Sequence, residues 1–214
     1  MTKQFIDLFK RPTSEAARGK YLSRVFGIFS EELVRIWAAD PRAPYEDLGR
    51  PTLRCSPSDR GSTLDFTLRC RETGKIYVAE LKCEIEYQNY KYLVLTSPQQ
   101  LNHHSKPAFA ALLAAASNGP SVRVYVARQE VSVDGAILIW GAATEEGRSL
   151  VMEQNGFASI LTVAEIIRDL QDWQSKPYRD LLELRQQWSN DLYDTLLASP
   201  RTDASPIIPP DAAR

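Results

Sequence analysis

The chain has 214 residues, of which 43% are hydrophobic and 25% are charged, and its formal net charge is -1. This composition is typical of a globular protein with one sizeable core, and the charge alone gives no indication of a nucleic-acid binder. The apolar runs are too short for a membrane span. Three cysteines without metal-binding spacing, and an N-terminus without a secretory signal, predict a cytoplasmic protein.

The first half of the chain predicts one long helix followed by three strands. Residues 14–40 have apolar side chains at helical spacing, which favours an amphipathic helix. A short strand is expected at 52–55, and two longer strands are expected at about 62–70 and 75–82. Because the last two are joined by a short turn at Gly74, they should pair antiparallel.

The next predicted elements are a helix and two buried strands. Ser97 and Gln100 have the spacing of a capping box, so a helix should begin there. Pro107 is expected to kink or restart it. Apolar runs at 122–127 and 136–143 predict strands.

The C-terminal part is expected to contain a further strand and two helices. The strand is placed at 149–154, with Asn155-Gly156 as a hairpin turn. Thr162 and Glu165 form a second capping box that opens a helix, and a last helix runs to residue 198. The Pro-rich tail, 199–214, is expected to be disordered.

These elements predict a single domain over residues 1–198. Its core, at about 14–128, has the order helix, three strands, helix and strand. Residues 129–198 would form a C-terminal extension of strands and helices. The predicted class is α/β, with a mixed central sheet flanked by helices.

Three charged residues interrupt the two central strands: Asp65, Glu80 and Lys82. Alternate residues of a strand share a face, so antiparallel pairing should bring both carboxylates and the ammonium group together. Two such carboxylates repel each other unless a cation lies between them, and oxygen ligands select Mg²⁺ or Mn²⁺. Such an ion activates water and neutralises a phosphoryl oxygen, while the lysine stabilises developing negative charge. The pattern therefore predicts phosphodiester hydrolysis.

The simpler alternative is a solvent-facing side of the sheet with a surface salt bridge between the strands. Alternating charged residues are routine in antiparallel sheets. The apolar neighbours of Glu80, such as Val78, weigh against this alternative, because a buried charge needs a partner or a metal.

These residues resemble the motif of the PD-(D/E)XK nuclease superfamily, the restriction-endonuclease-like enzymes. "LD" at 64–65 corresponds to the first half of the motif, with Leu64 in place of a proline that supplies no ligand, and "ELK" at 80–82 corresponds to the second half. The order of elements is also similar to the core of that family. The resemblance implies a nuclease with Mg²⁺ or Mn²⁺ as cofactor, and the expected substrate is DNA, with RNA as the alternative. It assigns metal binding to Asp65, Glu80 and the Leu81 carbonyl, and catalysis to Lys82.

Relatives in that family add a glutamate from the first helix and a glutamine or lysine from the helix after the second motif. Glu32 is the first candidate, because it borders the predicted apolar stripe while Glu31 lies opposite; an exposed helix glutamate is an equal alternative. The stripe consists of Leu22, Phe26, Phe29, Leu33 and Ile36. Gln100 is the second candidate, and a purely capping role with Ser97 is its alternative.

Substrate contacts are expected around the motif, because residues 50–106 carry nine lysines and arginines against six acidic residues. The candidate contacts with nucleic acid are Arg69, Tyr87, Tyr90, Lys91, His103 and Lys106. Packing in the core is the alternative for the tyrosines. His103 and His104 should diverge by ~100° on a helix, so they are not expected to share a metal.

The expected function is therefore a metal-dependent endonuclease or exonuclease in restriction, repair or defence. The alternative is a catalytically silent nucleic-acid-binding or assembly module on the same fold. A homodimer would supply the two active sites needed to cut a duplex. No membrane association is expected.

Overall fold

The computed structural model describes residues 20–54, 60–82, 93–117 and 122–198, with side chains from residue 25 onward. The chain divides into two compact units at Ser175 and Lys176. In the second unit the described element is helix α6 (Lys176–Leu197), which exposes large apolar side chains that include Trp188 and Leu196. No helix within the described residues is both long enough and apolar enough to cross a bilayer.

The first unit begins with a long helix, continues with a series of short strands, and then combines helices and strands. Its helices are α2 (Lys20–Ala39), the 3-10 helix η2 (Pro98–Leu101), α3 (Pro107–Ala116), α4 (Glu145–Asn155) and α5 (Val163–Asp172). Its strands are β1 (Tyr45–Asp47), β2 (Pro51–Arg54), β3 (Ser62–Thr63), β4 (Phe66–Cys70), β5 (Ile76–Lys82), β6 (Val94–Leu95), β7 (Arg123–Val126), β8 (Gln129–Val131), β9 (Ala136–Trp140), β10 (Ala142–Ala143) and β11 (Ser159–Thr162).

The central sheet is mixed and has the strand order β1-β4-β5-β9-β11. Strand β4 is antiparallel to β1 and β5, as predicted for the strands on either side of Gly74, which has a φ of +72°. Strand β9 is parallel to both β5 and β11. Residues 136–162 therefore supply two strands of the central sheet, and the architecture is α/β.

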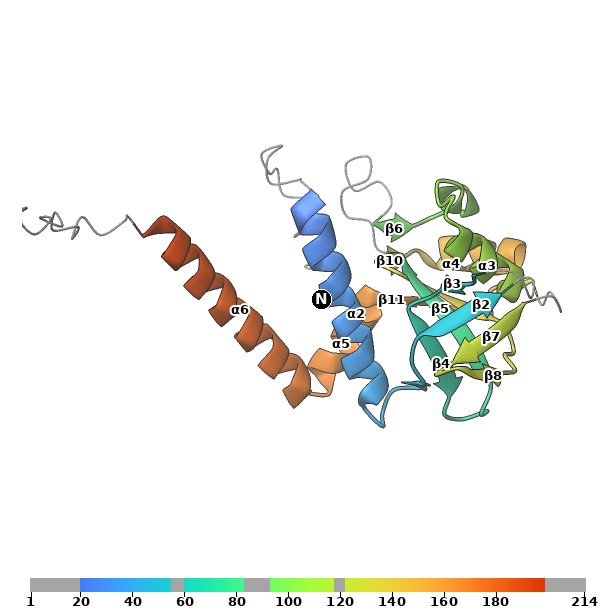
Figure 1. Ribbon diagram of the computed structural model, residues 1–214, viewed down its shortest axis with the longest axis horizontal. Helices are drawn as coiled ribbons and strands as arrows, with labels where there is room; N and C mark the ends of the chain where they lie inside the picture. The colour runs from blue at the N-terminus through green and yellow to red at the C-terminus, as the bar shows by residue number, and fades with distance from the viewer. Residues whose placement is uncertain (1–19, 55–59, 83–92, 118–121, 199–214) are drawn as a thin grey trace, which may run out of the picture. The chain divides into compact units, whose positions relative to one another are not determined.

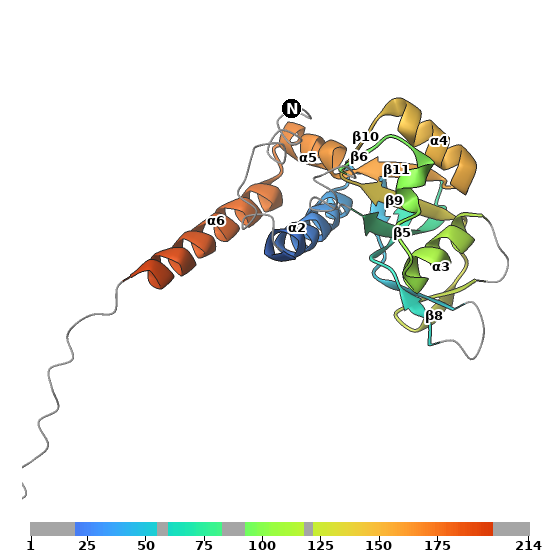
Figure 2. The ribbon, with the colours of Figure 1, turned by 90° about the horizontal axis from the view of Figure 1, so that it is seen from above.

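Helices cover both faces of the central sheet. Helices α2 and α5 lie on one face, and α3 and α4 lie on the other (Figures 1 and 2). The Trp37 indole donates a hydrogen bond to Asp169 Oδ2 over 3.0 Å and so joins α2 to α5. On the opposite face Phe109 and Leu112 of α3 belong to the same buried cluster as Val78 and Leu138. Alternation places Glu80 and Lys82 on this second face, with Val78.

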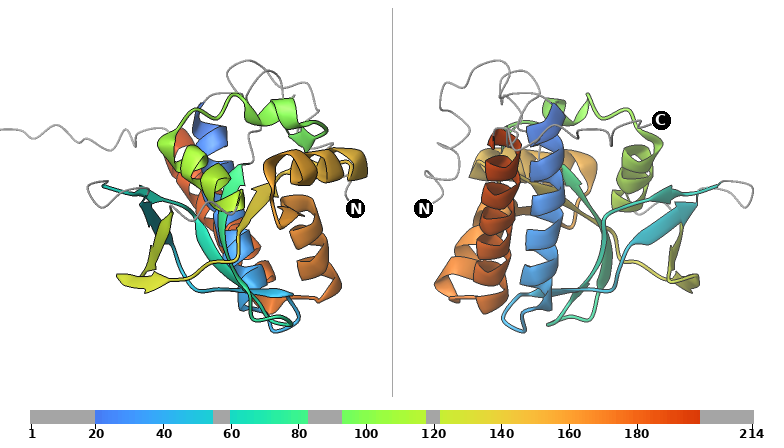
Figure 3. Two further views of the ribbon diagram at one scale, coloured as in Figure 1. Left: turned by 90° about the vertical axis from the view of Figure 1, so that its right-hand side faces the viewer. Right: turned by 60° about the vertical axis from the view of Figure 1, so that its left-hand side comes forward.

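A smaller sheet, in the order β3-β2-β7-β8, stands away from α2 and α5 (Figure 3). The strand predicted at 122–127 forms here, as β7, and pairs antiparallel with β2. The strand predicted at 62–70 is divided between the two sheets. Its first part, β3, pairs with β2, and its second part, β4, pairs with β5. The chain passes from one sheet to the other at Leu64 and Asp65.

One prediction about local structure is wrong, and one edge strand of the central sheet was missed. Residues 149–154 belong to helix α4 and not to a strand, and Gly156 ends that helix in the left-handed conformation, with a φ of +76°. The helix is favoured by the Thr144 side chain, which caps it, and by two glutamates in its first turn. Strand β1 was not predicted, because three residues between Pro44 and Gly49 carry little periodic pattern.

Other predicted signals are confirmed. The Glu165 amide donates to Thr162 Oγ1 over 3.1 Å, and the Thr162 hydroxyl donates to the Glu165 carboxylate over 2.7 Å, which completes a cap on α5. The helix expected from Ser97 is a single 3-10 turn, and α3 then begins at Pro107, where a restart was expected.

Candidate active site

Asp65 lies at the bend between β3 and β4, where the chain crosses between the two sheets. The Leu81 amide donates a hydrogen bond to Asp65 Oδ2 over 2.9 Å. On the other carboxylate oxygen, Asp65 Oδ1, the Arg50 guanidinium forms an ion pair over 3.3 Å. The aspartate is therefore held from β5 on one side and from the residue before β2 on the other.

Glu80 and Lys82 project from the same face of β5, two residues apart. Lys82 Nζ lies 2.5 Å from Glu80 Oε1. Only 6% of Glu80 is exposed, and its second oxygen, Oε2, is buried without a hydrogen-bond partner within the described residues. The alternative of a solvent-facing pair is thus wrong for Glu80.

Burial raises the pKa of Glu80, because the charged carboxylate loses contact with water. The positive charge of Lys82 opposes this rise, and the negative charge of Asp65 adds to it. Asp65 is hydrogen-bonded to the amide of Leu81, the residue between Glu80 and Lys82, and Glu80 is paired with Lys82. The predicted gathering of Asp65, Glu80 and Lys82 is therefore present.

The Leu81 backbone also faces this site. The N–H and C=O of one strand residue point toward the same neighbouring strand, and the Leu81 N–H already bonds to Asp65. The Leu81 carbonyl is consequently directed to the Asp65 side of β5, where the resemblance would place an additional ligand.

The donor set fits a hard divalent cation that keeps part of its water shell. It comprises two carboxylates and one carbonyl oxygen, and the buried Glu80 Oε2 is an acceptor with unused capacity. In the described part of the chain, no three histidine, cysteine or acidic residues come together as a metal site. A cation at this place would thus be bound mainly by Asp65 and Glu80, with water completing the shell.

Gln100 is 6% exposed, and its side chain binds the backbone before η2. Its Oε1 accepts hydrogen bonds from the amides of Thr96 and Ser97 over 2.6 and 3.0 Å, and its Nε2 donates to the Val94 carbonyl over 2.9 Å. The capping role named as its alternative is therefore present. A further catalytic role for Gln100 remains a prediction.

The two histidines do not diverge as expected, because they follow η2 in a turn and not in a helix. Their rings are in contact, with centroids 3.8 Å apart and planes tilted by 41°, and His103 Nδ1 lies 2.6 Å from the Gln100 carbonyl oxygen. His104 also packs edge-on against Trp140, at 5.8 Å between centroids. Trp140 is the register partner of Lys82 on β9, so His104 lies on the Lys82 side of the sheet.

His104 lies near Lys82, and no role in the site was predicted for it. Burial lowers its pKa from 6.5 to about 3, and the positive charges of Lys82 and Lys106 contribute to the decrease. The ring is therefore neutral at physiological pH. An interruption of helix periodicity between Leu101 and Pro107 is the signal that could have indicated a turn here.

Glu32 is half-buried on α2, the helix on the other face of the sheet. The sequence argument that chose it over Glu31 does not hold, because the buried stripe of α2 is rotated from the predicted one. The fully buried side chains of α2 are Ser30, Leu33, Val34, Trp37 and Ala38. Glu31 is also partly buried, and it forms an ion pair with Arg35 over 3.0 Å.

The predicted nucleic-acid contacts are dispersed. Arg69 lies on β4 and forms an ion pair with Glu46 on the neighbouring strand β1. Lys106 is exposed at the N-terminus of α3, and His103 is half-buried. Three further candidates, Tyr87, Tyr90 and Lys91, fall outside the described residues.

Comparison of the chain with models of protein families, with curated proteins and with solved structures found no match.

Proposed function

We propose that the chain is a metal-dependent nuclease that hydrolyses phosphodiester bonds, with DNA as the preferred substrate. The observation that carries this proposal is the environment of Glu80: a buried carboxylate with a raised pKa beside Asp65 and Lys82. Burying a carboxylate next to a second negative charge costs free energy. A hard cation between them would remove the penalty.

The proposed roles follow from the chemistry of each group. Asp65, Glu80 and the Leu81 carbonyl would hold Mg²⁺ or Mn²⁺, which supplies charge neutralisation at a phosphoryl oxygen. The Asp65 carboxylate is kept in place by the Leu81 amide. Lys82, 18% exposed at its side chain, would donate a hydrogen bond to a non-bridging phosphate oxygen as negative charge develops there. Glu32 and Gln100 stay as candidate supporting residues.

A cleavage assay tests the proposal. Labelled single-stranded DNA, duplex DNA and RNA are incubated with Mg²⁺, Mn²⁺ or EDTA. We expect cleavage that needs the metal, and a rate lower by at least about 10²-fold for Asp65→Asn, Glu80→Gln and Lys82→Met. Glu72→Gln and Lys75→Met change exposed residues of the adjoining turn and serve as controls. Equal rates in all variants, or metal-independent cleavage, would contradict the proposal.

The second candidate is a nucleic-acid-binding module without turnover. It is favoured by the two ion pairs, Arg50 with Asp65 and Lys82 with Glu80, which balance both carboxylates without a metal. In this case binding would weaken steeply with salt through the phosphate contacts and would be the same in Mg²⁺ and in EDTA. Absence of cleavage together with such binding would support it.

The cellular setting belongs to the same proposal. We place the activity in the cytoplasm, in restriction, repair or defence, on the basis of the cysteine content and the resemblance of the motif. Cutting both strands of a duplex requires two active sites, which a homodimer would supply. Light scattering of the protein with and without a duplex would measure whether two copies assemble.

A further inference from the structure

A pocket of about 500 Å³ opens on the smaller sheet, and none of its lining residues is a predicted motif residue. It is lined by Arg50, Thr52, Arg54, Tyr125, Ala127 and Arg128. Thr52 and Tyr125 are register partners on β2 and β7, so they lie on one face of the sheet. Their neighbours Leu53 and Val124 are buried on the other face. The pocket therefore lies on the outer side of the smaller sheet.

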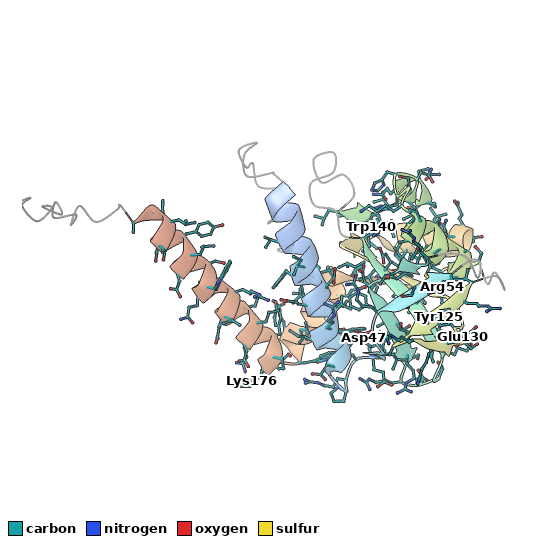
Figure 4. The ribbon with its side chains drawn as sticks, viewed as in Figure 1. Asp47, Arg54, Tyr125, Glu130, Trp140 and Lys176 are labelled. Atoms are coloured by element: carbon teal, nitrogen blue, oxygen red, sulfur yellow. The ribbon has the colours of Figure 1, made fainter. Side chains whose placement is uncertain are left out.

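This outer face carries an excess of positive charge. Arg54 is the register partner of Arg123, so both project beside the pocket together with Arg128. None of these three forms an ion pair within the described part of the chain. Glu130, opposite Tyr125, is an acidic residue on the same face, and it leaves the local charge positive (Figure 4). Guanidinium groups gathered without carboxylate partners repel one another, and an anion would relieve that repulsion.

Tyr125 gives the pocket an aromatic surface. The ring is half-buried, and the Arg54 guanidinium carbon lies 5.5 Å from its centroid. An aromatic ring beside arginines is the arrangement by which single-stranded nucleic acid is bound, with bases on the ring and phosphates on the arginines. The pocket thus combines both kinds of contact that one nucleotide needs.

The turn that carries Arg128 has an unfavourable backbone conformation. Val126 and Gln129 pair across β7 and β8, so Ala127 and Arg128 form a two-residue hairpin loop. Their φ angles are +48° and +69°, in the left-handed region where glycine or asparagine is usual. The sequence thus has an arginine at a position that glycine would occupy with less strain. Strain of this kind is typical of functional positions.

Arg50 connects the pocket to the candidate active site, because it lines the pocket and also forms the ion pair with Asp65. We propose that the outer face of the smaller sheet is a binding site for one nucleic-acid strand. Arg54 and Arg128 bind its phosphates, Tyr125 stacks on a base, and Arg50 is at the end nearest Asp65. The inference rests on the proposed nuclease function for its substrate class.

Binding is measured without metal, so that it is independent of cleavage. A fluorescent 12-nucleotide DNA strand is titrated with the protein in EDTA at several salt concentrations. We expect Arg54→Gln/Arg128→Gln to weaken binding at least tenfold and to reduce the salt slope by about 1.4, for two lost phosphate contacts. Arg168→Gln/Arg179→Gln removes two exposed arginines elsewhere and should leave both values unchanged.

The strained turn offers a sharper pair of variants. Arg128→Gly relieves the backbone strain and removes the charge, so it should raise the melting temperature and still weaken binding. Arg128→Lys keeps a positive charge on the same left-handed backbone, so it should retain more affinity than Arg128→Gly and gain no stability. A purely structural role for Arg128 would give no loss of affinity in either variant and would overturn the proposal.

Inorganic polyphosphate of similar length separates a nucleic-acid site from a general anion site. Tyr125→Ala should lose about tenfold in affinity for DNA and none for polyphosphate, because only DNA has bases that stack. Equal losses for both ligands would overturn the assignment to nucleic acid, as would wild-type affinity for DNA in the Arg54/Arg128 variant.

If Glu80→Gln binds normally but does not cleave, both proposals stand. If the wild type binds through these residues and never cleaves, the nuclease proposal alone fails.

Discussion

The Arg50 guanidinium lies 3.3 Å from Asp65 Oδ1, and this ion pair joins the residue before β2 to the bend before β4. It links the two sheets of the first unit at the point where the chain passes between them. It also means that a divalent cation at Asp65 would meet a positive charge already in place. Arg50 is 56% exposed at its side chain, so it can move away when a metal or a phosphate arrives.

Removal of Arg50 should therefore strengthen metal binding in the absence of nucleic acid. We expect Arg50→Gln to bind Mn²⁺ more tightly by less than about tenfold, because the exposed ion pair is partly screened by solvent. Isothermal titration of the free protein measures the change. Arg168→Gln is the matched control on α5, and weaker Mn²⁺ binding by Arg50→Gln would contradict the competition.

Lys82 should stabilise the fold through its ion pair with Glu80. Lys82→Met leaves the glutamate buried without its cation, and we expect a loss of about 1 to 3 kcal/mol in the free energy of unfolding at pH 8. The double variant Glu80→Gln/Lys82→Met should recover most of this loss. Urea denaturation measures both values, with the exposed Lys75→Met as control. A double variant as unstable as Lys82→Met would show that Lys82 acts through another contact.

The raised pKa of Glu80 predicts how stability depends on pH without metal. The folded state favours the protonated form of Glu80. Below the ordinary pKa of 4.5 the carboxyl is protonated in both states, so it costs no stability. As pH rises through the raised pKa of the folded state, the carboxylate must be charged while buried, and the protein loses stability. Glu80→Gln should match the wild type near pH 4 and become more stable than it at higher pH. Urea denaturation from pH 4 to pH 8 measures this difference. A difference that shrank with rising pH would contradict the assigned direction.

Helix α4 packs closely against the segment that follows β6. A methyl group on Gly147 would lie 2.4 Å from the Leu95 carbonyl oxygen and 2.6 Å from Thr96 Cα. We expect Gly147→Ala to lower the free energy of unfolding by about 1 to 3 kcal/mol. Gly27→Ala has open space on α2 and should instead add about 0.5 to 1 kcal/mol, as measured by thermal and urea denaturation.

Local sequence signals predicted the elements that depend on local chemistry. Gly74 in a tight turn, the Thr162 cap and the restart at Pro107 each act within a few residues, and each is found where it was expected. The gathering of Asp65, Glu80 and Lys82 followed from strand alternation and a short turn. Such features are fixed by the backbone over short distances.

The features that depend on distant parts of the chain were not predictable in this way. The bend at Asp65 arises because β3 pairs with β2 while β4 pairs with β5, which no pattern inside residues 62–70 records. The pocket around Tyr125 requires β2 and β7, which are far apart in the sequence, to be neighbours. The buried stripe of α2 differs from the predicted one, and its packing partner α5, to which Trp37 is hydrogen-bonded, lies far along the chain.

The most direct test of the central claim is the binding of Mn²⁺ to the free protein, followed by electron paramagnetic resonance. We predict one bound ion per chain for the wild type and for Glu72→Gln, and at least about tenfold weaker binding for Asp65→Asn and for Glu80→Gln. If Mn²⁺ bound all four proteins equally, or bound none of them, two carboxylates at this junction of sheets would not form a metal centre.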